Sequence, residues 1–419
     1  MQIPFDTPAR KWLIAAIAVS LAAAYVGLAG TLFLAAWFGE RAELTSLQRA
    51  VRFDPANANY RNHLGRYYEL VARDPAAAIG PYTEAIRLNP HSARFWFDLA
   101  SAYQVRGDVA NQTAALEHAI EADPTTPDVA WEAANLYLVQ GQNEKALREF
   151  RVVMANDNSL IPAAVQFCWR INPDVDALLR DVVPHRSEDY IAFLEFLMSK
   201  QETAASTKVW DALIQSGERF ERSHVFDYFN YLIRHKEVDE AVLVWRQGAS
   251  RFGLDSYLPS SSNLVINGNF SLDILNGGFD WQHQKQKSVE LTLDPRDFHG
   301  GRRSLQIVFD GPRVEDAGIF QYIPVQPNTT YELSAYYKSA DLVGAGGPHL
   351  TVQDMYAPKT IYYDSDDMKE TGYWKSVEGE FTTNADCKLV VLHVRRIPVG
   401  SPIRGKLWVD DFRLTRKPS

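Results

Sequence analysis

The sequence lacks several features that would assign it to well-known classes of protein. Its 419 residues include only two cysteines, Cys168 and Cys387, which lie in regions assigned below to different domains. Neither a disulfide framework nor a thiolate metal site can be built from them. Positive charge is also not in excess, because 43 Lys and Arg stand against 52 Asp and Glu, a formal net charge of −9. This excludes a nucleic-acid partner, which would demand a basic face.

Motifs of catalysis are missing as well. The adjacent aspartates at 366–367 and 410–411 cannot act together on one bond, because successive strand residues face opposite sides of a sheet. The histidines of the last third show no metal-ligand spacing. No nucleophile elbow, phosphate-binding glycine loop or zinc motif occurs. We therefore predict a protein that is not an enzyme.

What is present is typical of a folded, multidomain chain. Hydrophobic residues make up 46% of the sequence and charged residues 23%, which is ordinary for globular protein. A length of 419 residues exceeds what one hydrophobic core usually organises, and predicts two or three domains.

One long apolar run lies near the N-terminus. Residues 12–38 carry no charge, with Arg10 and Lys11 before them and Glu40 and Arg41 after them. As a helix this run would be about 40 Å long, more than the hydrocarbon core of a bilayer at about 30 Å. It therefore predicts a tilted transmembrane helix.

Charge flanking the run predicts its orientation. The basic residues before it place a tail of residues 1–11 in the cytoplasm and the bulk of the chain in the periplasm. Cleavage by signal peptidase near Ala22 to Ala24 is the alternative. Cleavage there would leave the apolar residues 25–38 as an exposed stub, which favours an uncleaved anchor.

Small residues recur every four positions within the run, at Ala23, Gly27 and Thr31. Such a ridge lets a second helix approach closely in lipid, so we expect membrane-helix packing there. The alternative is that alanine is simply abundant in this segment.

A repeat of about 34 residues follows the apolar run. Asp54-Pro55, Asn89-Pro90 and Asp123-Pro124 close three units, with the prolines 35 and 34 residues apart. Small residues recur at Gly65, Ala100 and Ala134, and rings at Tyr68, Tyr103 and Tyr137. These motifs resemble the tetratricopeptide repeat (TPR) family. The resemblance implies an α-solenoid of helical hairpins over residues 44–157 that binds other proteins.

Two departures from the repeat are visible. The first unit has one additional residue in its middle turn at 73–75, where Pro75 can begin the second helix. The closing proline is lost after residue 157, although apolar stripes at helical spacing continue. We expect degenerate TPR-like hairpins over residues 158–257, with a separate helical domain as the alternative.

The TPR resemblance also implies where a partner binds. In that family, ligands lie along the face formed by the first helix of each hairpin. Here the implied protein-partner groove consists of Asn62, Arg66, Phe97, Ser101, Trp131 and Asn135. An exposed Phe97 or Trp131 suits a bound peptide, whereas packing of these rings against the next hairpin is the alternative.

Residues 263–417, which follow a polar linker at 258–262, alternate apolar and polar residues in short runs. The runs lie at 289–293, 305–309, 319–325, 331–335 and 389–394. They are separated by turn residues and predict an antiparallel β-sandwich. The order of motifs resembles the jelly-roll carbohydrate-binding modules, CBM4/9-like and galactose-binding-like. The motifs that carry this resemblance are Asn263–Phe270, Phe279–Trp281, Gly301–Leu305, Gln321–Val325, Thr330–Tyr331, Trp374 and Val409–Asp411.

This second resemblance implies sugar binding through exposed rings. The rings expected to take part are Trp281, Tyr322, Tyr362 and Trp374. Tryptophan in a sandwich is also often core, and a structural or protein-docking role is the alternative.

Several members of that family hold a structural calcium ion near the first and last strands. The resemblance implies Asp273, Asp410 and Asp411 as its ligands, while Ser271 stands where an acidic residue is common. No other cofactor is expected.

Together these features predict a multidomain α + β protein with one transmembrane helix, a TPR-like α-solenoid and a C-terminal antiparallel β-sandwich. We expect a single-pass protein of the inner membrane of a bacterial cell envelope. It would be a non-catalytic scaffold that binds protein partners through the solenoid, within a membrane complex or a polysaccharide assembly or export system. The alternative is an envelope glycan-binding protein whose solenoid is a spacer.

Overall fold

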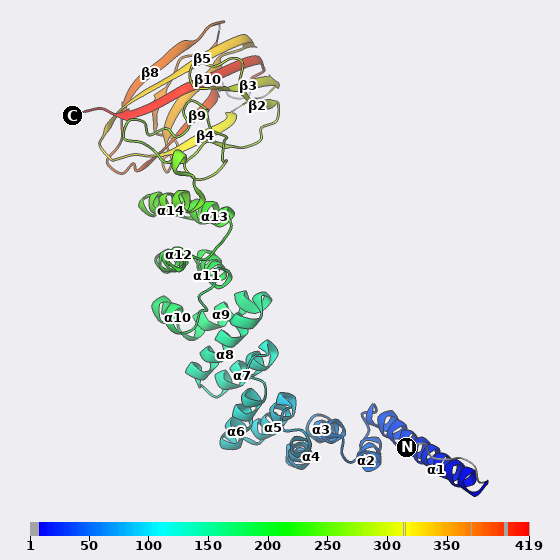
Figure 1. Cartoon of the computed structure of the whole chain (residues 1–419). Helices are drawn as coiled ribbons and strands as arrows, with labels where there is room; N and C mark the ends of the chain where they lie inside the picture. Colours follow the sequence, from blue (N-terminus) through cyan, green and yellow to red (C-terminus); the bar gives the residue numbers. More distant parts are fainter. Residues whose placement is uncertain (1–7, 313, 315, 370, 398–400, 419) are drawn as a thin grey trace, which may run out of the picture. The chain divides into compact units, whose positions relative to one another are not determined.

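The computed structural model describes residues 8–312, 314, 316–369, 371–397 and 401–418 (Figure 1). Residues 1–7 of the predicted cytoplasmic tail lie outside the described residues. The chain divides into two compact units, Met1–Phe196 and Leu197–Ser419, and the division falls within helix α11 (Ser187–Lys200).

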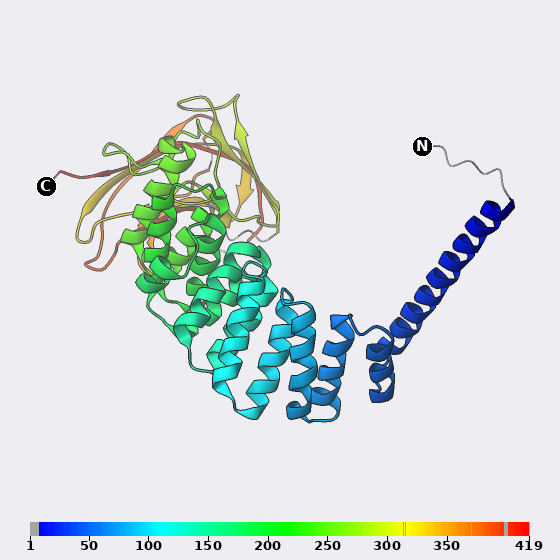
Figure 2. The ribbon, with the colours of Figure 1, turned by 60° about the horizontal axis from the view of Figure 1, so that its bottom comes forward.

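The described part of the first unit is helical. Its α-helices are α1 (Pro8–Gly39), α2 (Leu44–Phe53), α3 (Ala58–Arg66), α4 (Pro75–Leu88), α5 (Ala93–Arg106), α6 (Val109–Ala122), α7 (Pro127–Val139), α8 (Asn143–Asn156), α9 (Ile161–Ile171), α10 (Val175–Asp181) and the larger part of α11. Helices α3 and α4, α5 and α6, and α7 and α8 pack as successive hairpins, which Figure 2 shows side by side. The expected helical solenoid is therefore confirmed.

Close packing within each hairpin follows from the repeat motif. Gly65, Ala100 and Ala134 are buried, and a Cβ atom on Gly65 would clash with the ring of Tyr82 in the facing helix. Large rings such as Tyr82 fill the space that the small residues leave. Helix α5 ends at Gly107, where the hairpin turn begins, and the φ of +73° at this residue favours glycine.

The additional residue of the first repeat is accommodated by a π-helical turn, Tyr67–Val71, which continues α3. Its amide hydrogen bond runs from Ala72 N to Tyr67 O at 3.0 Å. The wider turn absorbs one residue without breaking the helix. Arg73 then takes a left-handed φ of +56°, and the Asp74 side chain caps α4 by accepting from Ala77 N.

Among the described residues, α1 is the one helix long and apolar enough to cross a membrane. It has 32 residues, and its side chains are almost all exposed. A signal sequence near the N-terminus meets the same criteria of length and apolar composition.

The second unit begins with helices and ends with a β-sandwich. After the end of α11, its helices are α12 (Thr203–Ser216), α13 (Arg222–Arg234) and α14 (Val238–Phe252). The strands are β1 (Gln282–His283), β2 (Val289–Asp294), β3 (Ser304–Gly311), β4 (Asp316–Pro324), β5 (Thr330–Gly344), β6 (Gly347–Asp354), β7 (Ile361–Asp364), β8 (Lys375–Thr382), β9 (Leu389–Ile397) and β10 (Ile403–Arg416).

The strands form two five-stranded sheets with the orders β1-β4-β9-β6-β7 and β2-β3-β10-β5-β8. Their described pairings are antiparallel, so the expected sandwich is confirmed. Alternate residues of both sheets point into one core, where the rings of Phe270, Trp281 and Phe412 pack together.

Helices α13 and α14 pack directly on the sandwich within this unit. The rings of Phe229 in α13 and Phe279 in the sandwich meet edge to face at 4.7 Å. The Trp245 ring of α14 lies so close to Gly278 that any side chain at position 278 would clash with it. The Tyr356 hydroxyl donates to the backbone oxygen of Ile233 at 2.8 Å. These contacts join the last helical hairpin and the sandwich into one packed body.

This interface predicts that Phe279→Ala destabilises α13, α14 and the sandwich together. The Phe279 side chain is 1% exposed, so its removal leaves a cavity and costs about 3–5 kcal/mol. We expect a lower unfolding temperature of the second unit in the full-length protein, with faster proteolysis in both α13 and the loop before β1. Phe298→Ala is the matched control, because that ring is 41% exposed. Equal stability of the two variants would contradict the packed interface.

Candidate functional site

A groove of about 390 Å³ lies on the outer face of the β1-β4-β9-β6-β7 sheet. Strand register brings its residues together, since Phe320 of β4 lies opposite His393 of β9, and Tyr322 lies opposite Val391. Gln353 of β6 pairs with Val391 from the other side. The groove therefore crosses three neighbouring strands.

One side of the groove is aromatic. The rings of Phe320 and Tyr322 are 5.2 Å apart, and both side chains are partly exposed. Burial raises the pKa of the Tyr322 hydroxyl, which keeps it neutral at physiological pH. These two rings form an apolar surface with a polar edge, the kind of surface on which a sugar ring can stack.

The centre of the groove is polar. His393 is 7% exposed, and its Nδ1 lies 3.3 Å from Asp316 Oδ2. Its Nε2 is buried and has no hydrogen-bond partner among the described residues. Arg395 Nη1 donates to Gln353 Oε1 at 3.3 Å. A buried ring nitrogen without a partner is costly to the fold.

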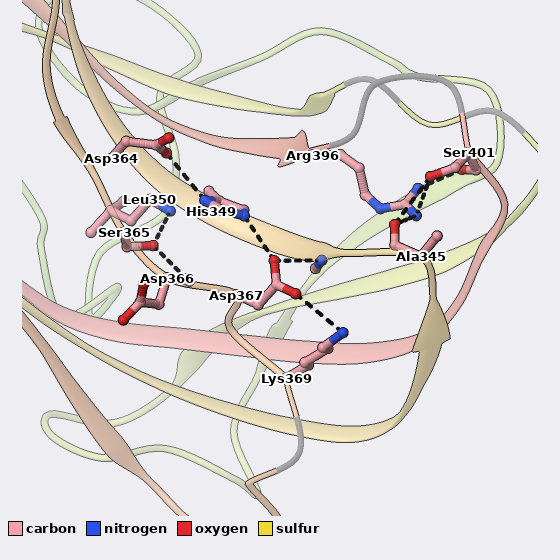
Figure 3. A network of polar contacts seen from close by, with 11 residues as sticks. Ala345, His349, Leu350, Asp364, Ser365, Asp366, Asp367, Lys369, Arg396 and Ser401 are labelled. Atoms are coloured by element: carbon pink, nitrogen blue, oxygen red, sulfur yellow. Dashed lines mark hydrogen bonds and ion pairs between the residues drawn. The ribbon is translucent and has the colours of Figure 1, made fainter.

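At one end of this sheet face, His349 of β6 lies between two carboxylates (Figure 3). Its Nδ1 is 3.2 Å from Asp364 Oδ1 and its Nε2 is 2.8 Å from Asp367 Oδ1. Although burial opposes it, hydrogen bonds from Gly347, Lys369 and His349 hold the pKa of Asp367 below its usual value. Because both imidazole nitrogens are engaged, this network ties the start of β6 to the chain after β7 and offers no free base for catalysis.

The neighbouring Arg396 also has a structural role. Its guanidinium donates to Ala345 O at 3.1 Å and to Ser401 Oγ at 2.8 Å (Figure 3). It also donates to Pro402 O at 3.0 Å. The side chain is 1% exposed, so its charge is held by backbone oxygens inside the fold.

The four rings predicted to bind sugar lie in different places. Tyr322 lines the groove. Trp281 is 1% exposed in the core and is not available to a ligand, because the sandwich needs a large apolar ring there. Tyr362 is partly buried and donates its hydroxyl to Asp354 at 3.2 Å. Trp374 lies in a ring cluster beside strands of the other sheet.

Sequence reasoning missed the other groove residues. The missed residues that line the groove with charge, rings or amide groups are Gln284, Asp316, Phe320, Gln353, His393 and Arg395. A signal was present, because strands were expected over residues 319–325 and 389–394. Alternate positions of those runs share one face, which would have grouped 320 with 322 and 391 with 393.

The aspartates implied as calcium ligands accept hydrogen bonds from nitrogen donors. The buried Asp410 carboxylate accepts from the backbone amides of His299, Gly300 and Asp411. Asp411 is also held by His299 Nδ1, 2.6 Å from its Oδ2. Burial raises the pKa of Asp410 to about 6.

The third implied ligand is paired with arginine. Arg303 donates from Nη2 to Asp273 Oδ1 at 2.7 Å and from Nε to Phe270 O at 2.7 Å. Calcium needs six to eight oxygen ligands, whereas both oxygens of Asp410 and one oxygen each of Asp273 and Asp411 already accept from nitrogen donors. Among the described residues, no cluster of three or more His, Cys, Asp or Glu could hold a metal. The residues present do not fit the ion.

In the solenoid, the two rings of the implied partner groove differ in exposure. Phe97 is 2% exposed. Trp131 is partly exposed and meets Phe150 and Phe167 edge to face at 5.4 and 5.6 Å. Through Phe167 of α9, Trp131 contributes to the contact with the next helices, which was the alternative that the sequence left open. Asn135 supports Trp131 by donating to its backbone oxygen at 2.9 Å.

The polar residues of the implied partner groove lie in different surroundings. Asn62 is 3% exposed and donates to Asp98 Oδ2 at 2.7 Å. Ser101 donates to Glu69 Oε1 at 2.6 Å. Arg66 is exposed and lines a separate pocket near the end of α1.

An exposed charged row crosses α5 and α7 instead. Arg94 Nε lies 3.2 Å from Asp98 and its Nη1 lies 4.0 Å from Glu132. The side chains of Arg94 and Glu132 remain 55% and 48% exposed. Burial, only partly offset by the charge of Arg94, raises the pKa of Glu132. Asp98 and Glu132 each follow a predicted groove residue by one position, so the repeat register contained this signal.

The predicted membrane-packing residues lie on one exposed face of α1. Nothing described in the structure lies within 4 Å of a Cβ atom built on Gly27. Thr31 donates to Leu28 O within the helix. Ala23 is exposed.

Comparison with known proteins bears chiefly on the sandwich. Residues 262–397, less than half of the chain, match the CBM_4_9 family model, described as a carbohydrate binding domain. The sandwich is similar to carbohydrate-binding modules. No curated protein matches the sequence.

Solved structures similar to parts of the chain are of two kinds. "CBM4 structure and function" describes one at 16% identity, covering 36% of this chain and 99% of its own, with a TM-score of 0.29. PilF of Pseudomonas aeruginosa, at 13% identity, covers 54% of this chain and 92% of its own, with a TM-score of 0.26. YrrB, described as a TPR protein with an unusual peptide-binding site, is also 13% identical, covers 50% and 93%, and has a TM-score of 0.25. These likenesses are too weak to say what this chain binds.

The hydrogen bonds from Arg303, His299 and backbone amides to these carboxylates predict that the sandwich does not depend on calcium. We expect addition of EDTA to leave the unfolding temperature of the full-length protein unchanged. Arg303→Met should lower it by about 4 °C or more, because two hydrogen bonds to a charged donor are lost. Arg302→Met, at the exposed neighbouring position, is the control and should have little effect. A fall in unfolding temperature with EDTA, restored by calcium, would reverse this conclusion.

Proposed function

We propose that this protein is a membrane-anchored, non-catalytic scaffold of the bacterial cell envelope. Helix α1 is its anchor in the inner membrane, residues 1–11 are the cytoplasmic tail, and the bulk of the chain is periplasmic. The solenoid binds a protein partner within a membrane complex or a polysaccharide assembly or export system. Ala23, Gly27 and Thr31 form the face of α1 that packs against a partner helix.

The charged row on α5 and α7 is the observation that carries this proposal. Its side chains are held in place by the Arg94 contacts to Asp98 and Glu132, yet the ends of Arg94 and Glu132 stay open to solvent. A pre-positioned, partly desolvated carboxylate suits a cationic or amide group on a partner better than a flexible surface charge does.

This proposal predicts that Glu132→Lys disrupts partner binding. Reversal of charge at the centre of the row should lower recovery of the partner at least about tenfold, because a like-charge contact replaces an attractive one. The measurement is affinity purification of full-length protein from detergent-solubilised membranes, with quantification of each co-purified protein. Glu121→Lys on α6 is the matched control, with a side chain that is 73% exposed. A partner retained equally by both variants would place its site elsewhere.

The groove on the sandwich favours a second function, binding of an envelope glycan. Its two rings and its Arg395–Gln353 pair supply a stacking surface beside planar polar groups. The family match over residues 262–397 supports the same ligand class. In this version the solenoid is a spacer or presents the sandwich to an assembled complex.

Glycan binding predicts that Tyr322→Ala weakens retention on polysaccharide. We expect about a tenfold loss of affinity, since loss of one stacked ring is worth about 1.4 kcal/mol. The measurement is affinity electrophoresis of the full-length protein through gels that contain soluble polysaccharides, after a glycan array has identified the ligand. Tyr373→Ala removes a ring that is 64% exposed and outside the groove, and should change nothing. Absence of any ligand on the array would leave the scaffold as the function of the chain.

A further inference from the structure

The C-terminal end of α1 packs against helices α2 and α3. The ring of Phe38 in α1 stacks on Phe53 in α2, with centroids 6.0 Å apart and planes 4° from parallel. A Cβ atom on Gly39 would clash with the ring of Tyr60 in α3. The guanidinium of Arg41 lies 3.6 Å above the ring of Trp37. Any surface near this junction therefore keeps a fixed position relative to the end of the apolar helix.

A pocket of about 280 Å³ opens at this junction. Part of its lining is apolar: Leu47 of α2 is buried, while Leu70 and Val71 of the π turn are 62% and 59% exposed. The π turn creates these two exposed positions, because it absorbs the additional residue of the first repeat. Such turns occur frequently at functional sites.

The remainder of the lining is charged. Arg41, His63 and Arg66 line the pocket together with one acidic side chain, Glu40. The pocket thus has an excess of positive charge in a chain whose formal net charge is −9. An apolar wall next to two guanidinium groups matches a ligand with a hydrocarbon tail and an anionic head.

We propose that this pocket binds an anionic phospholipid. Arg41 and Arg66 hold the phosphate, and the first part of an acyl chain lies along Leu47, Leu70 and Val71. This inference rests on the proposed anchoring of α1. The uncharged run ends at Phe38, so the pocket, which begins at Gly39, lies at the level of the lipid headgroups when α1 spans the bilayer.

The ligand chemistry makes a soluble phosphate a second source of the same contacts. The apolar wall favours the lipid, because a free phosphate would leave Leu70 and Val71 exposed to water. The test below therefore includes the lipid headgroup without its acyl chains.

The test uses full-length protein in a nonionic detergent and a fluorescent phosphatidylglycerol as the probe. We expect saturable binding that is stronger than binding of the matched phosphatidylcholine. The double variant Arg41→Gln, Arg66→Gln should bind about 25-fold more weakly, because each basic residue near lipid contributes about a factor of five. The double variant Leu70→Ser, Val71→Ser should also weaken binding. Glycerophosphoglycerol, the headgroup alone, should compete poorly.

The control pair is Val105→Ser with Arg106→Gln at the end of α5. Both positions are exposed, and Val105 at 66% matches the exposure of the π-turn residues. Binding of the probe to this variant should equal that of the unmodified protein. Equal binding by the Arg41, Arg66 variant, or full competition by the headgroup alone, would overturn the lipid pocket.

Failure of the anchor is distinguishable from failure of the pocket. Alkaline extraction of cell membranes and N-terminal analysis of the mature protein report on α1 by themselves. Cleavage near residues 22–24 would remove the proposed span yet leave every pocket residue in the chain. Saturable phosphatidylglycerol binding by an uncleaved, membrane-bound protein, lost in the arginine variant, supports both statements.

Discussion

The close approach of two helices at a residue with almost no side chain is the constraint on which the helical array depends. At Gly65 the facing ring of Tyr82 occupies the space that a Cβ atom would need. Ala100 and Ala134 repeat the arrangement in the next two hairpins. Since each hairpin buries its apolar face only against its neighbours, loss of one close contact would weaken the packing on both sides. The same rule recurs at Gly278, where Trp245 brings helix and sandwich together.

The spacing of the repeated residues and the size of their side chains were sufficient to predict the architecture. The Asx-Pro corners, with small residues at 65, 100 and 134, predicted the hairpins, and alternation at period two predicted the sandwich. The orientation of single rings was harder to predict. Phe97 and Trp131 were expected to line a peptide groove, but Phe97 is buried and Trp131 packs on Phe167 of α9, and no local pattern distinguishes the two uses. Trp281 is buried for the same reason in the sandwich.

The sandwich groove was only partly predictable, because it depends on strand register. Tyr322 was identified as a ring, whereas His393 and Arg395 come next to it only through the pairing of β4 with β9. The packing of α13 and α14 on the sandwich was likewise not foreseen, since Phe229, Trp245 and Phe279 look like ordinary core residues of separate elements. Asp273 was expected to be a calcium ligand, and its pairing with Arg303 is visible only in three dimensions.

The stiff connection between α1 and the first hairpin has a mechanical consequence. Under the proposed anchoring, the apolar run of 27 residues is longer than the hydrocarbon layer is thick, so the helix must tilt. The stacked rings of Phe38 and Phe53 fix the angle between α1 and α2. A change in bilayer thickness that alters the tilt of α1 would therefore also rotate the adjoining hairpins relative to the membrane plane. Lipid composition, through bilayer thickness, would then set the angle between the helical array and the membrane at which partners bind.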